Sequence, residues 1–153
     1  MLWRGRTWGD GRDRGRHTVK HSSTLQSTVS LSSGESEYYG IVKGSATGLS
    51  VQALAKDWDL ELKLELKADS SAGIGTAQRQ GLGRLRHVQT RYLWVQERVR
   101  RGEVAVSKVR GDRNPSDMLT KPMGKGKREY FMKMIGQWYM DGRAKMMKML
   151  ADE

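Results

Sequence analysis

Leucine and charged residues alternate strictly along residues 60–67, and this is the clearest pattern in the chain. A period of two places the leucines on one face of a β-strand. A similar alternation over residues 104–109 predicts a second strand, and short β-branched pieces at 18–21 and 27–31 predict one or two more. The polar and apolar pattern therefore predicts a sheet.

The longest predicted helix follows the second β-branched piece. Residues 32–35 have the Ser-x-x-Glu spacing of a capping box, so the helix is expected to begin there and to end near Trp58. Glycines at positions 40, 44 and 48 interrupt it and indicate close packing against another element. Its expected inner face consists of Tyr38, Ile41, Val42, Ala46, Leu49, Ala53 and Leu54.

Shorter helices are predicted between and after the two clear strands. They cover residues 72–80, 87–101 and 116–120, and Gly102 is expected to end the second of them. The order of elements from residue 18 is then β(β)-α-β-α-α-β-α. Strands that alternate with helices in this way are typical of the α/β class.

Composition divides the 153 residues into three parts around a single expected core. Residues 1–17 are an Arg/Gly arm with little to bury, residues 18–123 hold the predicted elements, and residues 124–153 form a Met-rich basic helical tail. An apolar stripe in the tail is typical of a core or a partner surface: Tyr130, Phe131, Met134, Ile135 and Trp138.

Charge points to a polyanionic partner. The chain has 28 Lys+Arg against 17 Asp+Glu, a formal charge of +11, which makes nucleic acid the first expected partner. The absence of Cys excludes disulfides and thiol nucleophiles. Without an apolar signal segment or span, we expect no membrane partner and an intracellular protein, in a cytoplasmic particle or the nucleus. The candidate nucleic-acid-binding residues, which could instead form a solvated helix face, are Arg79, Arg84, Arg86, Arg91 and Arg98.

Three acids are predicted at the ends of elements, where they could converge. Glu37 lies near the start of the long helix, Asp69 directly after the leucine strand, and Asp117 at the start of the last short helix. Carboxylate oxygens are the ligands that Mg²⁺ prefers. The alternative is that Glu37 and Asp117 only cap helices or interact with their dipoles.

Four motifs in order resemble the ribonuclease H domain of Copia-type retrotransposon Pol polyproteins. They are STVSLSSGESEY at 27–38, ADSSA at 68–72, RHVQTRY at 86–92 and NPSDMLTKP at 114–122, so the resemblance covers roughly residues 18–123. It implies a mixed five-stranded sheet with flanking helices, and a nuclease that cleaves the RNA strand of RNA–DNA hybrids with two Mg²⁺ (or Mn²⁺) ions. It also implies a reverse transcriptase partner within a polyprotein, and Glu37, Asp69 and Asp117 as catalytic and metal-binding acids.

The start of the chain departs from this family. Family members begin with a central strand that carries an aspartate, whereas Asp10 and Asp13 lie among glycines without an apolar run. We therefore expect a ribonuclease H-like α/β fold that is incomplete at its N-terminus, binds nucleic acid and cleaves weakly or not at all. One alternative is an active enzyme completed by the arm or by another chain. The other is a basic nucleic-acid-binding protein without catalysis.

Overall fold

The computed structural model describes residues 18, 20, 22, 26, 29–81, 83 and 88–137. The predicted arm at 1–17, with Asp10 and Asp13, lies outside the described residues. So do Trp138 of the tail and four residues of the predicted β-branched pieces, Val19, His21, Ser27 and Thr28.

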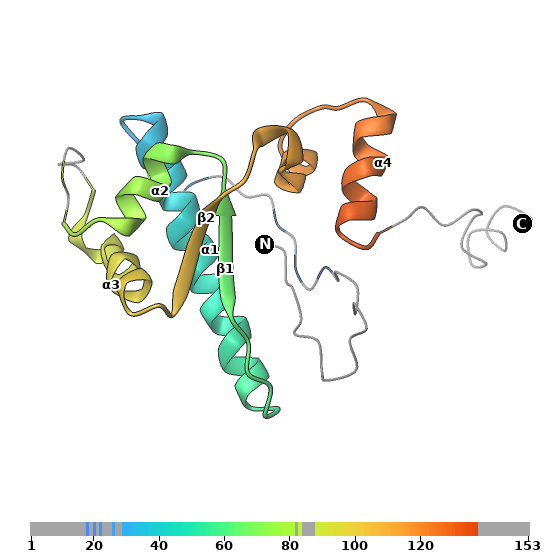
Figure 1. The fold of residues 1–153 in the computed structure, drawn as a ribbon. Helices are drawn as coiled ribbons and strands as arrows, with labels where there is room; N and C mark the ends of the chain where they lie inside the picture. The colour runs from blue at the N-terminus through green and yellow to red at the C-terminus, as the bar shows by residue number, and fades with distance from the viewer. Residues whose placement is uncertain are drawn as a thin grey trace, which may run out of the picture.

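Helices and strands alternate along the described chain, as predicted (Figure 1). The α-helices are α1 (Ser33–Lys56), α2 (Ser71–Gln78), α3 (Trp94–Arg100) and α4 (Lys125–Met134). The strands are β1 (Leu64–Ala68) and β2 (Val104–Lys108). Short 3-10 helices are η1 (Thr90–Tyr92), η2 (Gly111–Arg113) and η3 (Pro115–Leu119). This confirms the α/β class with a sheet that is incomplete in the described residues.

The start of α1 follows the predicted capping spacing with one change. The Ser32 hydroxyl accepts a hydrogen bond from the Glu35 backbone N–H at 3.2 Å, as a helix cap does. The Glu35 carboxylate accepts from the backbone N–H of Leu31 at 3.0 Å, one residue earlier than in a capping box. It also accepts from the Tyr39 hydroxyl at 2.7 Å. The carboxylate therefore joins the entering chain to the second turn of the helix.

The expected inner face of α1 is confirmed in part, and Leu49 in its second half packs, half-buried, against the core. Tyr38, Ile41 and Val42 are buried, but Ala46 and Ala53 are exposed. The buried positions farther along carry small residues, Ser45, Gly48 and Ala55. The helix thus contacts the sheet along a stripe of small residues, which an apolar-residue pattern does not reveal.

The glycines in α1 show where the helix approaches the sheet most closely. A Cβ added at Gly48 would lie 2.4 Å from Leu64 Cδ1, and one added at Gly44 would lie 3.3 Å from Leu66 Cδ2. A Cβ at Gly40 would meet no atom within 4 Å. The predicted close packing is confirmed at Gly44 and Gly48.

The two described strands are parallel and bury one face. Leu64 lies opposite Val104 and Leu66 opposite Val106, and all four side chains are buried against the helices. The other face carries Glu65, Lys67, Ala105 and Ser107, and the Ser107 hydroxyl donates to Glu65 at 2.8 Å. Helices therefore cover one face, as the position of α1 behind the strands shows (Figure 1).

The leucine strand is shorter than predicted. It begins at Leu64 because β2, its described partner, begins opposite that residue at Val104. Leu60 is in no strand and is 43% exposed, and Asp59 before it has a positive φ of 56°. Alternation alone therefore placed the start of the strand four residues too early. In the described chain, residues 60–63 have no neighbouring strand to pair with.

The strand predicted over 27–31 is absent where the structure describes it. Val29 and Ser30 are in no regular element, and Val29 and Leu31 are 87% and 68% exposed. In the described residues the sheet has two strands, fewer than the five that the resemblance implies. Without a strand beside β1, these apolar side chains have no sheet face to cover.

The predicted helix over 87–101 is divided. Its described part consists of η1 followed by α3, and Val88 and Val95 enter the core. Gly102, with φ 73°, ends it as predicted.

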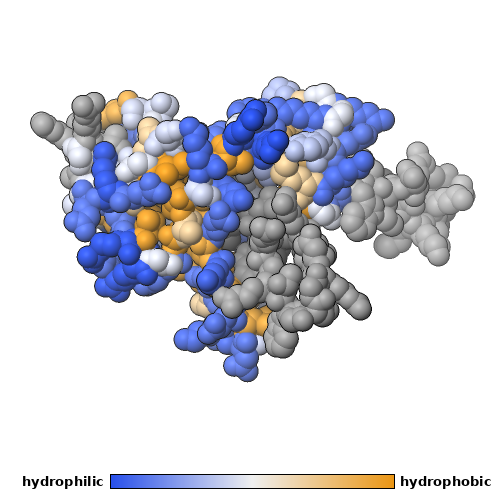
Figure 2. All heavy atoms as spheres, in the orientation of Figure 1, coloured by the Kyte–Doolittle hydropathy of each residue, from blue (hydrophilic) through white to orange (hydrophobic). Residues whose placement is uncertain are grey.

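The start of the tail forms α4, whose Phe131 is fully buried outside the main core cluster. In Figure 1, α4 stands apart from α1–α3, and Figure 2 shows a largely hydrophilic surface there, whereas apolar residues gather around the sheet. Among the described residues, no helix is long and apolar enough to cross a membrane.

Candidate active site

The three predicted acids lie on three different elements. Asp69 directly follows the carboxyl end of β1, Glu37 is in the second turn of α1, and Asp117 is in η3. Glu37 and Asp69 line one cavity of about 470 Å³, together with Asn114 and Ser116 beside Asp117. The carboxyl end of a parallel strand is the usual place for a ligand site in an α/β sheet.

Close contact between α1 and α2 brings Glu37 to the turn that carries Asp69. A Cβ added at Gly73 in α2 would lie 3.1 Å from Glu37 Cβ, and one added at Gly34 in α1 would lie 3.2 Å from Ala72 Cβ. Glycines therefore let the two helices approach closely just after Asp69. The Ser70 hydroxyl, which accepts from the Gly73 N–H at 3.2 Å, fixes the start of α2.

The carboxyl groups of Glu37 and Asp69 interact electrostatically. Partial desolvation raises the pKa of the Glu37 carboxyl, and the negative charge of Asp69 raises it further. The positive charge of Lys121 acts in the opposite direction on the same pKa. The two carboxylates are therefore close enough to repel each other, with a lysine nearby.

Lys121 connects Asp117 to the other two acids. Its Nζ donates to Asp117 Oδ1 at 3.0 Å, and the Asp117 side chain is only 13% exposed. The hydrogen bond to Asp117 and the charge of Asp117 raise the pKa of Lys121, with further contributions from Asp69 and Glu37. We refer to Glu37, Asp69 and Asp117 as the acid cluster. The structure places Glu37 and Asp69 on one cavity and pairs Asp117 with Lys121.

Lys121 was not among the residues singled out from the sequence. A signal was present, because it follows Asp117 by four positions, a spacing at which helical side chains meet. Its proximity to Glu37 and Asp69 could not be read from that spacing, since it depends on where η3 lies relative to β1.

The acid cluster does not form a metal centre in the described residues. Within the described part of the chain, no three His, Asp, Glu or Cys side chains are grouped closely enough to hold one. Asp117 is instead engaged by the Lys121 ammonium. The acids as placed do not fit a three-ligand metal centre, and their assignment as catalytic and metal-binding residues stays a prediction.

The predicted nucleic-acid-binding arginines that the structure describes contact protein groups. Arg91 Nη2 donates to the Tyr92 hydroxyl at 2.9 Å, and its guanidinium lies 4.9 Å from the centre of that ring. Arg98 forms an ion pair with Glu103. Arg79 is half-buried, and its guanidinium faces the turn at Gly83. Arg84 and Arg86 lie outside the described residues.

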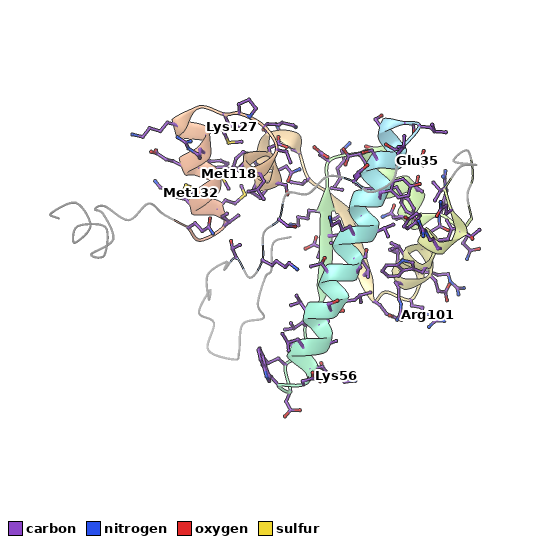
Figure 3. All side chains as sticks on the ribbon, turned by 180° about the vertical axis from the view of Figure 1, so that it is seen from behind. Glu35, Lys56, Arg101, Met118, Lys127 and Met132 are labelled. Atoms are coloured by element: carbon purple, nitrogen blue, oxygen red, sulfur yellow. The ribbon has the colours of Figure 1, made fainter. Side chains whose placement is uncertain are left out.

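Arg98 lies at the opposite end of the sheet from Asp69. Its partner Glu103 directly precedes β2, and the amino ends of both parallel strands meet at that edge. Figure 3 likewise shows Arg101, at the end of α3, far from Glu35 near the start of α1. Arg98 and Arg101 therefore do not flank the acid cluster, and nucleic-acid binding by the predicted arginines stays a prediction.

Other basic residues lie beside the acids. Lys20, Lys43 and Lys67 line the same cavity as Glu37 and Asp69. These lysines are dispersed along the sequence, so the high density of arginines between residues 79 and 101 does not point to them. Lys67 was detectable, because it precedes Asp69 by two positions in the leucine strand.

Comparison with known proteins agrees with a retrotransposon origin. No protein-family model and no solved structure matches the chain. The Retrovirus-related Pol polyprotein from transposon TNT 1-94 of Nicotiana tabacum is 28% identical over 120 residues, which is 77% of this chain. The chain spans about 9% of the length of that relative. The chain is therefore related in sequence to part of a retrotransposon Pol polyprotein.

Proposed function

We propose that this chain is a retrotransposon-derived ribonuclease H-like domain that binds RNA–DNA hybrids and, by itself, cleaves them weakly or not at all. One observation supports the proposal: Glu37 and Asp69 line one cavity at the carboxyl end of β1, together with Asn114 and Ser116 of the segment that carries Asp117. The four sequence motifs supply these acids, and the relationship to a Pol polyprotein supports their origin.

Binding is supported by the lysines of the cavity. Lys20, Lys43 and Lys67 line the same cavity as Glu37 and Asp69, and the whole chain carries a formal charge of +11. Lysine and arginine contacts to phosphates supply most of the sequence-independent affinity for nucleic acids. A hybrid held by these lysines would lie with its backbone beside the acid cluster.

The pairing and the placement of the acids in the acid cluster support weak cleavage. Hydrolysis with two metal ions requires carboxylates that hold both ions in register. Asp117 is paired with an ammonium group, and the acids of the described chain are not grouped as three ligands. Since misplacement by about 1 Å can cost about 10²-fold in rate, this arrangement favours binding over turnover.

A second candidate is an active ribonuclease H completed by a further strand. β1 pairs with β2 along one edge, and no described residue pairs with its other edge, which borders the cavity. An extended segment can add to such an edge through backbone hydrogen bonds. The segment would come from upstream sequence or from the reverse transcriptase part of a polyprotein.

Binding can be tested with a fluorescently labelled RNA–DNA hybrid and the full chain. Lys43→Ala/Lys67→Ala should weaken binding and lower the slope of log K against log salt by up to about two, the change for two lost phosphate contacts. Lys56→Ala/Lys63→Ala is a matched control with the same charge change, and Figure 3 shows Lys56 at the far end of α1.

The two double variants separate local binding from net charge. The control should bind more tightly than the cavity variant at about 50 mM and at about 200 mM salt, where affinity as a whole is weaker. Equal losses in both variants would show that the cavity lysines have no specific role. An affinity that does not change with salt would contradict polyanion binding altogether.

A further inference from the structure

Arg91 differs from the three arginines that follow it in its segment, because it has no acidic partner in the described part of the chain. Each of the others forms an ion pair with a carboxylate of Glu97 or Glu103, and they are Arg98, Arg100 and Arg101. Arg91 is exposed, and no carboxylate of the residues that the structure describes pairs with it. Its positive charge is therefore not offset by a neighbouring acid and is available to an external anion.

The guanidinium of Arg91 is held over the ring of Tyr92. It lies 4.9 Å from the ring centre, and its Nη2 donates to the Tyr92 hydroxyl at 2.9 Å. A planar guanidinium that lies on an aromatic face still has N–H groups along its edge, in a geometry that matches phosphate oxygens. An arginine that is already held in place also loses less conformational freedom when it binds.

Tyr92 is in turn fixed to the first turns of α1. Its ring packs edge-on against the ring of Tyr39, with 4.9 Å between the ring centres, and its backbone carbonyl accepts from the Tyr38 hydroxyl at 2.8 Å. The Tyr39 hydroxyl donates to the buried carboxylate of Glu35 at 2.7 Å. Two aromatic rings therefore connect Arg91 to the long helix.

The same rings connect Arg91 to the candidate site. Tyr39 lines the cavity that Glu37 and Asp69 also line, so Arg91 is two ring contacts away from the wall of that cavity. A nucleic acid backbone that contacts the cavity lysines continues beyond them. A cation beside the cavity then adds a phosphate contact.

We propose that Arg91 is a phosphate-binding residue of the hybrid-binding surface and that Tyr92 is the positioning residue that presents it. The inference rests on the proposed function for the nature of the ligand. It extends the binding surface from the cavity lysines to η1. It also gives a role to the end of the RHVQTRY motif, which contains no acid.

The experiment measures binding of a fluorescently labelled RNA–DNA hybrid to the full chain at several salt concentrations. Arg91→Gln should weaken binding and lower the slope of log K against log salt by about one, the change for one lost phosphate contact. Arg100→Gln is the matched control, since it removes the same charge from an arginine that is paired with Glu97. It should leave the slope unchanged, and equal effects of the two changes would overturn the inference.

A double-mutant cycle tests the positioning role of Tyr92. Tyr92→Leu should weaken hybrid binding in the unmodified chain and have no further effect when Arg91→Gln is already present, because Tyr92 acts through Arg91. An equal loss in both backgrounds would indicate a merely structural role and overturn the positioning role. If Tyr92→Leu does not fold, Tyr92→Phe takes its place in the cycle, since it keeps the ring and removes the acceptor of the Arg91 hydrogen bond.

The inference and the proposed function fail in different ways. Unchanged binding in Arg91→Gln, together with weaker binding in Lys43→Ala/Lys67→Ala, would overturn the inference alone. Weaker binding in Arg91→Gln without an effect of the lysine changes would support the inference and contradict the role of the cavity lysines. A chain that does not bind the hybrid would overturn both.

Discussion

Gly48 of α1 lies directly against Leu64 of β1, so closely that a single added methyl group would overlap the leucine side chain. The Cβ would lie 2.4 Å from Cδ1, 2.7 Å from Cδ2 and 3.1 Å from Cγ of Leu64. Leu64 is buried and pairs with Val104, so its side chain has little room to move. This contact sets the distance between the long helix and the sheet.

We expect Gly48→Ala to be less stable than Gly40→Ala by about 1–3 kcal/mol, the usual cost of overpacking. Both changes are in α1 and bring the same gain in helix propensity, but a Cβ at Gly40 meets nothing within 4 Å. Urea unfolding monitored by circular dichroism measures the difference. Equal free energies of unfolding would mean that the helix does not approach the sheet as described.

Stability should fall at alkaline pH because of two buried tyrosines. Burial raises the pKa of Tyr38 and of Tyr39 to about 12, and the hydrogen bond to Glu35 adds to the effect on Tyr39. A pKa raised from its usual value of about 10 means that folding favours the neutral phenol. The contribution is complete below about pH 10 and is lost as the pH rises toward about 12.

Unfolding free energies measured across that pH range check this expectation. Tyr39→Phe should show a shallower decline than the unmodified chain, because one of the two phenols no longer titrates. Tyr130→Phe is the control, since the Tyr130 side chain is 49% exposed. A decline of the same steepness in all three proteins would assign the pH dependence to other groups.

Adding an upstream strand with an aspartate should produce cleavage of a hybrid in the presence of Mg²⁺ or Mn²⁺. The strand would pair with the edge of β1 that no described residue occupies, and its acid would join Asp69 at the same end of the sheet. The rate of hybrid cleavage should exceed that of the 153-residue chain by more than about 10²-fold, because misplacing a catalytic group lowers a rate by about that factor. Gel analysis of a labelled RNA strand measures it.

Variants of the extended protein identify the groups responsible. Asp69→Asn and Glu37→Gln should each abolish the new activity without preventing hybrid binding. Strong cleavage by the unextended chain, lost in Asp69→Asn, would contradict the proposed weakness and point to an acid within residues 1–17.

Local signals made parts of this fold predictable. The start of α1 at Ser33 follows from the Ser32 cap. The four residues 32–35 are enough to recognise the Ser-x-x-Glu spacing of that cap. The end of α3 at Gly102 follows from a positive φ that glycine adopts without strain. These features depend on neighbours in sequence, so the sequence contains them directly.

Features that depend on partners distant in sequence were less predictable. The leucine strand begins at Leu64 and not at Leu60 because its partner strand begins at Val104, which lies opposite Leu64 but 40 positions later in the sequence. The arginines near Arg98 lie away from Asp69 because the strands are parallel, which no local pattern specifies. The ends of their elements suggested that Glu37 and Asp69 would meet, and they line one cavity, but no local pattern indicated that η3 lines it too.

The position of α4 has a consequence for how the candidate site forms. Glu37 and Asp69 lie on α1 and on the turn after β1, two elements that contribute to the main core, whereas Asp117 and Lys121 belong to η3 and the residues after it, against which α4 packs. Met118 of η3 and Met132 of α4 lie on these two neighbouring elements (Figure 3). Proteins open locally in cooperative units of unequal stability. Opening of the η3–α4 unit would carry away one carboxylate together with its lysine, so assembly of the site is coupled to local folding at this end of the chain.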